Sequence, residues 1–469
     1  MRIRLPLLLS SVLLAACGSS SGDSNPLPAT DSGSPGDGSG DVVVDSAPEI
    51  AIDSGCSTPI APDPLSLKRA ACTYAAGAKV ADTLGVTDAD RKKLPISHVI
   101  VVMKENRSFD HYFGKRSDVE GIPADFTNPD TTGAKVAFTH ETNSCFPYDP
   151  EHQWVAMHAQ YDDGKMDGFI KNAAARSVGA DDSTPVTTDG HYVMTYRERA
   201  DLPFYNFLGD TYALADHYFS SAISGTWANR LYLYAGTSYG VKDTGKDFVK
   251  ADATGIFEAL TAAKVTWGVY SDDTFPLDGA LLTAGWDSSH AGVGKVQAFF
   301  DAIKNGTLPQ VVFIDAGLNT EDEHPPGDLQ VGEAWTKKIY DAITGSSYWL
   351  DKDGKGVAMI WTYDESGGFA DHVAPPKACV ASPDQAEFDH LGFRVPFVMI
   401  SPFARKKYVS HVEHSHTSIT RFIELLFDVP AMTARDANSD ALLDMFDFGC
   451  PAMDKPPTPP SPATGGCKK

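Results

Sequence analysis

Short, uninterrupted apolar runs recur through the middle of the chain. They occupy residues 98–103, 266–270, 311–314, 357–362 and 396–401. An apolar run without alternation is the pattern of a strand that is covered on both faces. We therefore expect these runs to form a buried sheet.

Amphipathic stretches lie between the apolar runs, at residues 256–263, 295–305, 333–343 and 417–427. Their apolar positions recur at the spacing of one helix face. Strands that alternate with helices predict an α/β fold, in which a mainly parallel sheet carries helices on both sides. In such sheets the chemistry lies just beyond the carboxyl ends of the strands.

The N-terminus predicts export and a lipid anchor. Arg2 and Arg4 precede a short apolar core at residues 5–14, and residues 14–18 read Leu-Ala-Ala-Cys-Gly. This segment resembles the bacterial lipobox, in which the cysteine, here Cys17, becomes the lipidated first residue. By the same resemblance, glycine after that cysteine favours the outer membrane, with the periplasmic or surface side left open. An ordinary signal peptide with a chance cysteine is the alternative.

Composition divides the rest of the chain. Residues 1–16 are expected to be the signal peptide and residues 17–60 an acidic tether, because Gly, Ser, Asp and Pro dominate there. Residues 61–450 are expected to form the catalytic domain, and residues 451–469 a Pro-rich, extended tail.

The formal net charge of −23 argues against nucleic acid as a partner, because nucleic-acid binding requires a basic surface. Solubility of an exported protein is a sufficient alternative explanation for the charge.

Seven cysteines occur, and six remain when Cys17 is set aside. In an oxidising compartment they indicate disulfides, and six cysteines allow 15 pairings. Pairs of Cys56 with Cys72 and of Cys450 with Cys467 are attractive because each would fasten one end of the domain.

Two strand ends deliver oxygen-rich side chains. Glu105 and Asn106 follow the run at 98–103, and Asp364 and Glu365 follow the run at 357–362. Three carboxylates and one amide predict a site for Ca²⁺, Mg²⁺ or Mn²⁺ in preference to Zn²⁺. Strand-end caps and loop salt bridges are the alternative.

Three further residues are candidates for catalysis. Thr226 precedes a helical pattern, where it could act as a nucleophile or only cap the helix. His324 stands before two prolines that stiffen its loop, which suits proton transfer, and a capped turn histidine is the alternative. His152 carries a weaker signal on its own.

Together these segments resemble the bacterial phosphoesterase family that includes non-specific phospholipases C and acid phosphatases. The matching segments, which keep their order, lie at residues 98–114, 164–169, 225–230, 322–326, 363–376 and 416–424. The resemblance implies an alkaline-phosphatase-like three-layer α/β/α sandwich with a mainly parallel central sheet.

The resemblance also implies roles for individual residues. The metal ligands would be Glu105, Asn106, Asp364 and Glu365, and the catalytic residues would be Thr226, His324 and His152. The residues beside the substrate would be Asn106, Asn229, Arg230, His372 and His416. Two positions depart from the family pattern: Ala228 stands where proline is usual, and Ser415 where an acidic residue is usual.

Three functions compete at this point. The first is phospholipase C-type cleavage of phospholipid phosphodiesters through a phosphothreonine, and the second is an acid phosphatase that acts on small phosphomonoesters. The third is a non-catalytic, metal-binding lipoprotein, against which the intact nucleophile and ligands argue.

Replacing Cys17 by serine is expected to move the protein out of the membrane fraction, because the acyl chains that anchor it could no longer be attached. Fractionation of cells followed by immunoblotting measures the change. Membrane partitioning that stays the same in Cys17→Ser would count against lipidation.

Overall fold

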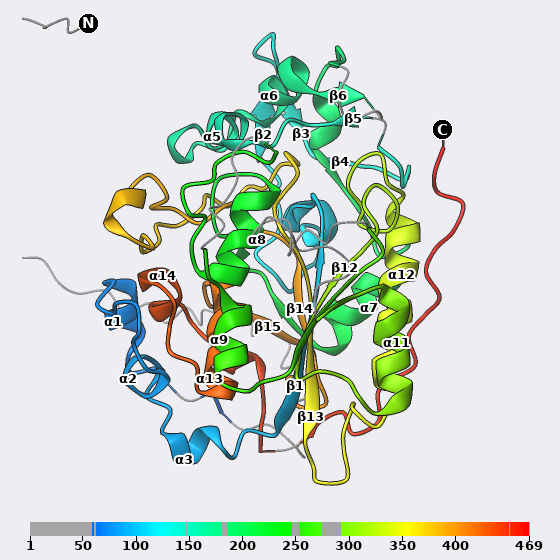
Figure 1. Ribbon diagram of the computed structural model, residues 1–469. Helices are drawn as coiled ribbons and strands as arrows, with labels where there is room; N and C mark the ends of the chain where they lie inside the picture. The colour runs from blue at the N-terminus through cyan, green and yellow to red at the C-terminus, as the bar shows by residue number, and fades with distance from the viewer. Residues whose placement is uncertain are drawn as a thin grey trace, which may run out of the picture. The chain divides into compact units, whose positions relative to one another are not determined.

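An eight-stranded sheet forms the centre of the computed structural model (Figure 1). The structure describes residues 59–60, 62–146, 148–179, 185–245, 253–273, 292–449 and 451–468. The strands run in the order β11-β10-β12-β1-β13-β14-β8-β15. In chain order their bounds are β1 Ile96–Lys104, β8 Ala213–Ala215, β10 Trp267–Ser271, β11 Val293–Gly294, β12 Val311–Asp315, β13 Gly356–Tyr363, β14 Phe397–Ile400 and β15 Tyr408–Ser410.

The five apolar runs are all strands of this sheet. The central strand β1 lies parallel to both neighbours, so that Val101 stands beside Phe313 of β12 and Ile360 of β13. These three side chains are buried. The expectation of strands covered on both faces is confirmed.

One strand, β14, runs antiparallel to its neighbours β13 and β8, while the other paired strands of the sheet are parallel. An antiparallel neighbour needs no crossover helix. The segment between β13 and β14 accordingly contains only a single 3-10 turn, Pro383–Gln385, among its described residues.

Helices cover both faces of the sheet, which gives three layers (Figure 1). One face carries α8 (Thr226–Ala235), α9 (Ile256–Ala262) and α13 (His416–Phe427). The other carries α7 (Pro203–Thr211), α11 (Val296–Asn305) and α12 (Leu329–Thr344). The predicted α/β/α sandwich is confirmed, and four of these helices match the amphipathic stretches.

Smaller elements gather at the end of the sheet where β1 and β13 finish, at the top of Figure 1. A second hydrophobic cluster that includes Met157, Phe169 and Phe393 holds them together. They are β2 Thr127–Pro129, β3 Lys135–Ala137, β4 Thr139–His140, β5 Tyr148–Asp149, α5 Trp154–Tyr161, α6 Phe169–Arg176, β6 Val178–Gly179 and β7 Thr195–Tyr196.

The other described helices and strands are short. They are α1 Ser66–Ala70, α2 Val80–Leu84, α3 Asp88–Arg91, α4 Phe109–Phe113, β9 Tyr218–Phe219, β16 His414–Ser415 and α14 Ala434–Ala437.

The disulfides differ from the pairs that sequence proximity favours. Cys72 is bonded to Cys379 and Cys145 to Cys467, with Cα–Cα distances of 5.5 and 4.9 Å. The suggested pairs of Cys56 with Cys72 and of Cys450 with Cys467 are therefore wrong. Folding brings together cysteines that are 307 and 322 residues apart, and sequence spacing contains no trace of that proximity.

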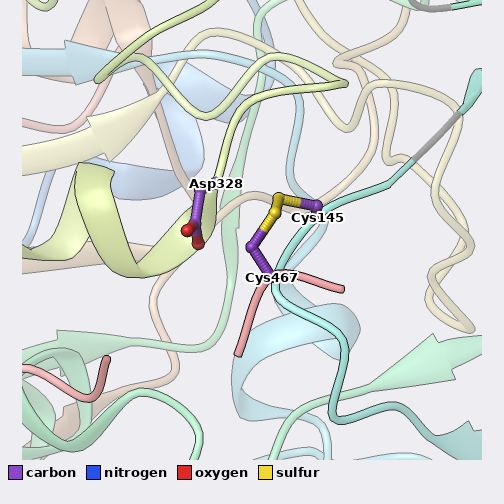
Figure 2. Close-up of side chains that lie close together, drawn as sticks. All are labelled: Cys145, Asp328 and Cys467. Carbon is purple, nitrogen blue, oxygen red and sulfur yellow. A yellow bond between two sulfur atoms is a disulfide. The ribbon is translucent and has the colours of Figure 1, made fainter. Parts of the chain in front are cut away.

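The Cys145–Cys467 bond lies beside Asp328, the N-cap residue of α12 (Figure 2). Asp328 also forms a β-bridge with Cys145, and the backbone N–H of Leu329 donates to Ser144 O at 3.0 Å. Since both sulfur atoms are used in the disulfide, this group is a structural fastening and not a metal site.

The Pro-rich tail has no helix or strand over residues 451–468, as expected, but it is attached to the domain along its length. Trp349 Nε1 donates to Met453 O at 2.8 Å, and Tyr340 Oη donates to Pro457 O at 3.2 Å. Near the end, Gly466 N donates to Gln330 Oε1 at 2.9 Å. The disulfide completes this docking.

Among the described residues, no helix is long and apolar enough to cross a membrane. Cys17, the signal peptide and nearly all of the tether lie outside the described residues, as do Cys56 and Cys450.

Removing the Cys145–Cys467 bond is expected to loosen the tail. The double variant Cys145→Ser/Cys467→Ser should lose roughly 2–4 kcal/mol of unfolding free energy, because its unfolded chain regains conformational freedom. Chemical denaturation measures the loss, and limited proteolysis should cut first within residues 451–469. A tail that stays equally resistant to protease would show that its hydrogen bonds suffice.

Candidate functional site

The ends of β1 and β13 bring three carboxylates together. Lys104 and Tyr363, the last residues of these strands, stand side by side, so the residues that follow them leave the sheet at one point. Asp364 N donates to Lys104 O at 3.0 Å across this junction. As a result, Glu105, Asp364 and Glu365 are buried and each places a carboxylate oxygen within 4.8 Å of the others.

Asn106 joins this acidic centre through an unusual backbone conformation. Its φ of 64° lies in the left-handed region, which non-glycine residues seldom adopt. A Cβ on Gly367 would lie 2.3 Å from the Asn106 Cβ, so glycine is required there. This close approach explains one of the two glycines that follow Glu365.

Burial makes the acidic centre electrostatically unfavourable without a cation. Burial raises the pKa of Glu105 to about 7, with Asp322 and Glu365 adding to the shift, although Arg230 opposes it. Burial and the nearby Glu105 raise the pKa of Asp364 to about 8. Burial raises the pKa of Glu365 to about 7. A bound cation would remove this penalty.

The donor atoms of the centre fit a hard divalent cation. Asn106 Oδ1 and Glu365 Oε1 are buried and have no hydrogen-bond partner in the described part of the chain. Buried polar atoms in native proteins nearly always have a partner, so two such atoms in one centre indicate a missing ligand. Their carboxylate and amide oxygens are the donors that Ca²⁺, Mg²⁺ and Mn²⁺ prefer.

Thr226 lies next to the acidic centre as the first residue of α8. Its hydroxyl donates to Glu105 Oε2 at 3.3 Å. Gly225 occupies the N-cap position, and no side-chain cap bond is present there. The alternative in which Thr226 only caps the helix is therefore wrong, because its hydroxyl is directed at a carboxylate instead.

Arg230 forms ion pairs with the carboxylates around the acidic centre. Its guanidinium is buried and pairs with Glu105 Oε1 at 2.7 Å, Asp315 Oδ1 at 2.7 Å and Asp364 Oδ2 at 3.1 Å. These pairs hold the carboxylates in place, and the expected contact of Arg230 with the substrate stays a prediction. Thr226 and Arg230 lie one turn apart on α8, so one helix supplies both contacts to Glu105.

Asn229 is bonded to the backbone before α8, and its expected place beside the substrate stays a prediction. Its Oδ1 accepts from the backbone N–H groups of Ser221 and Ala222, both at 2.8 Å, and its Nδ2 donates to Ser224 O at 2.6 Å. With its amide engaged by backbone, Asn229 holds the turn that starts α8 and so fixes the position of Thr226.

His416 and His372 also have other partners. His416 Nε2 donates to Asp364 O at 2.7 Å and its Nδ1 accepts from Tyr218 Oη at 2.9 Å. Burial lowers the pKa of His416 to about 4, so it is neutral. His372 Nδ1 lies 2.7 Å from Asp110 Oδ2, in a group with Asp371. Both histidines hold neighbouring segments in place, and their expected contact with the substrate stays a prediction.

His152 and His324 are brought together, with their rings 5.8 Å apart. Each Nδ1 donates to a backbone carbonyl at 2.7 Å, Pro150 O for His152 and Pro325 O for His324. This bond fixes each ring and turns its Nε2 towards the site. His152 Nε2 lies 3.4 Å from Asn106 Nδ2.

Asp149, Asp315 and Tyr218 belong to the site but are absent from the sequence-based assignment. Asp149 lies between the two histidines, 3.6 Å from His152 Nδ1 and 3.9 Å from His324 Nε2. Asp315 ends β12, so the rule that found Glu105 and Asp364 also applies to it. No sequence signal marks Asp149 or Tyr218, because their roles come from contacts between distant segments.

An α/β sandwich with a buried acidic centre beside a threonine hydroxyl is compatible with a metal-assisted hydrolase. The comparison with protein families identifies the class of hydrolase. Residues 96–430 match the Phosphoesterase family, so the chain belongs to the phosphoesterase family and is a phosphoric ester hydrolase.

Relatives of known name support this membership. The chain is 29% identical to non-specific phospholipase C3 of Arabidopsis thaliana over 419 residues, which cover 78% of this chain and 76% of the relative. It is 29% identical to phospholipase C B of Mycobacterium tuberculosis over 429 residues, which cover 76% of this chain and 78% of the relative.

Likeness to solved structures is weaker. Human ectonucleotide pyrophosphatase/phosphodiesterase 5 aligns with 49% of this chain and 90% of its own, at 11% identity and a TM-score of 0.32. A Vibrio parahaemolyticus protein of the alkaline phosphatase superfamily aligns with 51% of this chain and 63% of its own, at 13% identity and a TM-score of 0.34.

The acidic centre predicts a measurable link between metal and stability. Calcium, magnesium or manganese at about 100 times its Kd should raise the unfolding free energy by about 2.7 kcal/mol. Glu365→Gln should abolish this increase, while its metal-free form stays at least as stable because one repelling charge is gone. Thermal unfolding with chelator and with each cation measures both effects. A metal-induced shift that persists in Glu365→Gln would place the ion elsewhere.

Proposed function

We propose that this protein is a metal-dependent phospholipase C that hydrolyses phospholipid phosphodiesters through a phosphothreonine intermediate. One observation carries the proposal: the Thr226 hydroxyl lies at the start of a helix and 3.3 Å from a carboxylate of the acidic centre. The plant and mycobacterial relatives that bear the name phospholipase C favour a phospholipid substrate.

The start of α8 suits attack on phosphorus. The positive end of the helix attracts a phosphoryl group to the side chain of Thr226. Glu105 Oε2 accepts the hydrogen bond of the Thr226 hydroxyl and is its nearest proton acceptor. A divalent cation at the acidic centre would offset the charge of the substrate and strengthen the nucleophile.

His324 is the candidate acid for the leaving group. Its Nε2 lies 3.9 Å from Asp149 Oδ2, and its Nδ1 is held by Pro325 O at 2.7 Å. When the Thr226 Oγ–P bond forms and the P–O bond to diacylglycerol breaks, His324 gives its Nε2 proton to the departing oxygen. The same nitrogen then takes a proton from the water that hydrolyses the phosphothreonine and releases the phosphorylated head group.

His152 is the candidate second contact for the phosphoryl group. Its side chain is buried, and its Nε2 lies 3.8 Å from Glu365 Oε1 and close to Asn106. This position lies between the acidic centre and His324, where a phosphoryl oxygen would need a donor.

A lipid on Cys17 would place the enzyme at its substrate. We propose that the protein is exported and held by this lipid at the outer membrane. The supporting observation is the Leu-Ala-Ala-Cys-Gly segment at residues 14–18. The Cys17→Ser fractionation described above tests it.

A substrate screen separates the phospholipase from the phosphatase reading. Purified protein is incubated with phosphatidylcholine vesicles and, separately, with a soluble aryl phosphomonoester, each with and without chelator. We expect diacylglycerol and phosphocholine to form, and chelator to stop their formation. Turnover confined to the monoester would make the protein an acid phosphatase.

Thr226→Ala should cost on the order of 10³-fold or more in turnover, because the attacking oxygen is removed. Thr226→Ser keeps a hydroxyl and should retain most of the activity. Steady-state kinetics on vesicles measure both variants, and thermal unfolding checks that each is folded. Turnover of Thr226→Ala within about tenfold of wild type, which is roughly 1.4 kcal/mol, would show that another group attacks phosphorus.

A further inference from the structure

A buried carboxylate outside the acidic centre, Glu323, accepts four donors at once. Tyr363 Oη donates to its Oε2 at 2.5 Å, and Lys104 Nζ lies 3.1 Å from its Oε1. The hydroxyls of Tyr112 and Tyr205 donate to Oε2 and Oε1 respectively. All five side chains are buried.

Glu323 and two of its partners each directly precede a residue of the candidate site in the sequence. Lys104 directly precedes Glu105, and Tyr363 directly precedes Asp364. Glu323 itself directly precedes His324. The hydrogen bonds of one carboxylate therefore join the end of β1, the end of β13 and the loop that carries His324.

Two backbone features make room for the Glu323 side chain. Glu323 has a φ of 77°, in the left-handed region, where a non-glycine residue is strained. A Cβ on Gly332 of α12 would lie 2.3 Å from the Glu323 Cγ and Oε1 atoms, so only glycine leaves room for the side chain. Strain and a dedicated space at one residue indicate a specific task.

Stability alone gives little reason for such a group. Taking a carboxylate and an ammonium out of water costs several kcal/mol per ion, and apolar residues of similar volume often stabilise a core as well or better. The gain that remains is a fixed geometry, because four hydrogen-bonded donors from β1, β13, α4 and α7 meet at one point.

We propose that Glu323 is a positioning residue that sets the spacing between the metal ligands Glu105 and Asp364 and the ring of His324. It acts through Lys104, through Tyr363 and through its own peptide bond to His324. This inference rests on the proposed function, because it assumes that the acidic centre holds a divalent cation. In this proposal the hydroxyls of Tyr112, Tyr205 and Tyr363 hold the Glu323 carboxylate in a fixed position.

The test compares two tyrosine variants. Tyr363→Phe removes one hydrogen bond to Glu323 without changing any charge. Tyr212→Phe is the matched control, since Tyr212 is equally buried and its hydroxyl bonds to Tyr340 Oη at 2.9 Å, away from Glu323 and its hydrogen-bond partners. Both variants lose one buried hydroxyl, so a purely structural effect should lower the Tm of both.

Metal affinity and kinetics separate positioning from stability. Isothermal titration with Mn²⁺ or Ca²⁺ should show Tyr363→Phe binding about 10-fold or more weakly than wild type, the range seen when groups behind metal ligands are lost. Tyr212→Phe should bind within about twofold of wild type. At saturating metal, Tyr363→Phe should show a lower kcat and a nearly unchanged KM, because the displaced groups act on the transition state.

Glu323→Gln gives a second, stronger perturbation. It leaves Lys104 without its counter-charge, so the double variant Glu323→Gln/Lys104→Met accompanies it to keep the charge balanced. We expect both to bind metal more weakly than Tyr363→Phe. If either fails to fold, the tyrosine pair still decides the matter.

Two negative results have different meanings. Wild-type protein that binds none of the cations would overturn the metal-dependent function itself. Wild-type protein that binds metal, with Tyr363→Phe equal to Tyr212→Phe in affinity and in kcat, would overturn only the positioning role of Glu323.

Discussion

Mutual repulsion of buried carboxylates at the junction of β1 and β13 is the constraint on which the rest of this structure depends. Glu105, Asp364 and Glu365 lie within 4.8 Å of one another and away from water, which raises the pKa of each. The Arg230 guanidinium neutralises part of this negative charge by pairing with Glu105 and Asp364. The oxygens that remain without partners are the strongest reason to expect a cation there.

Several residues that the sequence predicts to lie beside the substrate also support this centre. Arg230 neutralises it, His416 holds the Asp364 carbonyl, and Asn229 holds the turn before Thr226. A precise site needs such support because its own side chains repel one another or carry weak single bonds. Residues that match a family motif can therefore be required for the geometry of the site.

The phosphoesterase reading agrees with the distribution of charge in the site. A phosphodiester anion could not approach three ionised carboxylates unless a cation lay between them. Thr226 is on the edge of the acidic centre, and His152 and His324 form a separate, nitrogen-rich edge. The two edges suit the two sides of a phosphoryl group, one for attack and one for proton transfer.

The sequence by itself determined the fold class, five of the eight sheet strands and the acidic centre. Continuous apolar runs identify strands covered on both faces, and the residues after parallel strands must meet at one edge, which predicts Glu105 with Asp364. Only the tertiary structure decided the disulfide partners, the pairing of Asp149 with two histidines and the donors around Glu323. These contacts join segments that are far apart in the chain, and their specificity comes from packing, which local patterns of polarity do not record.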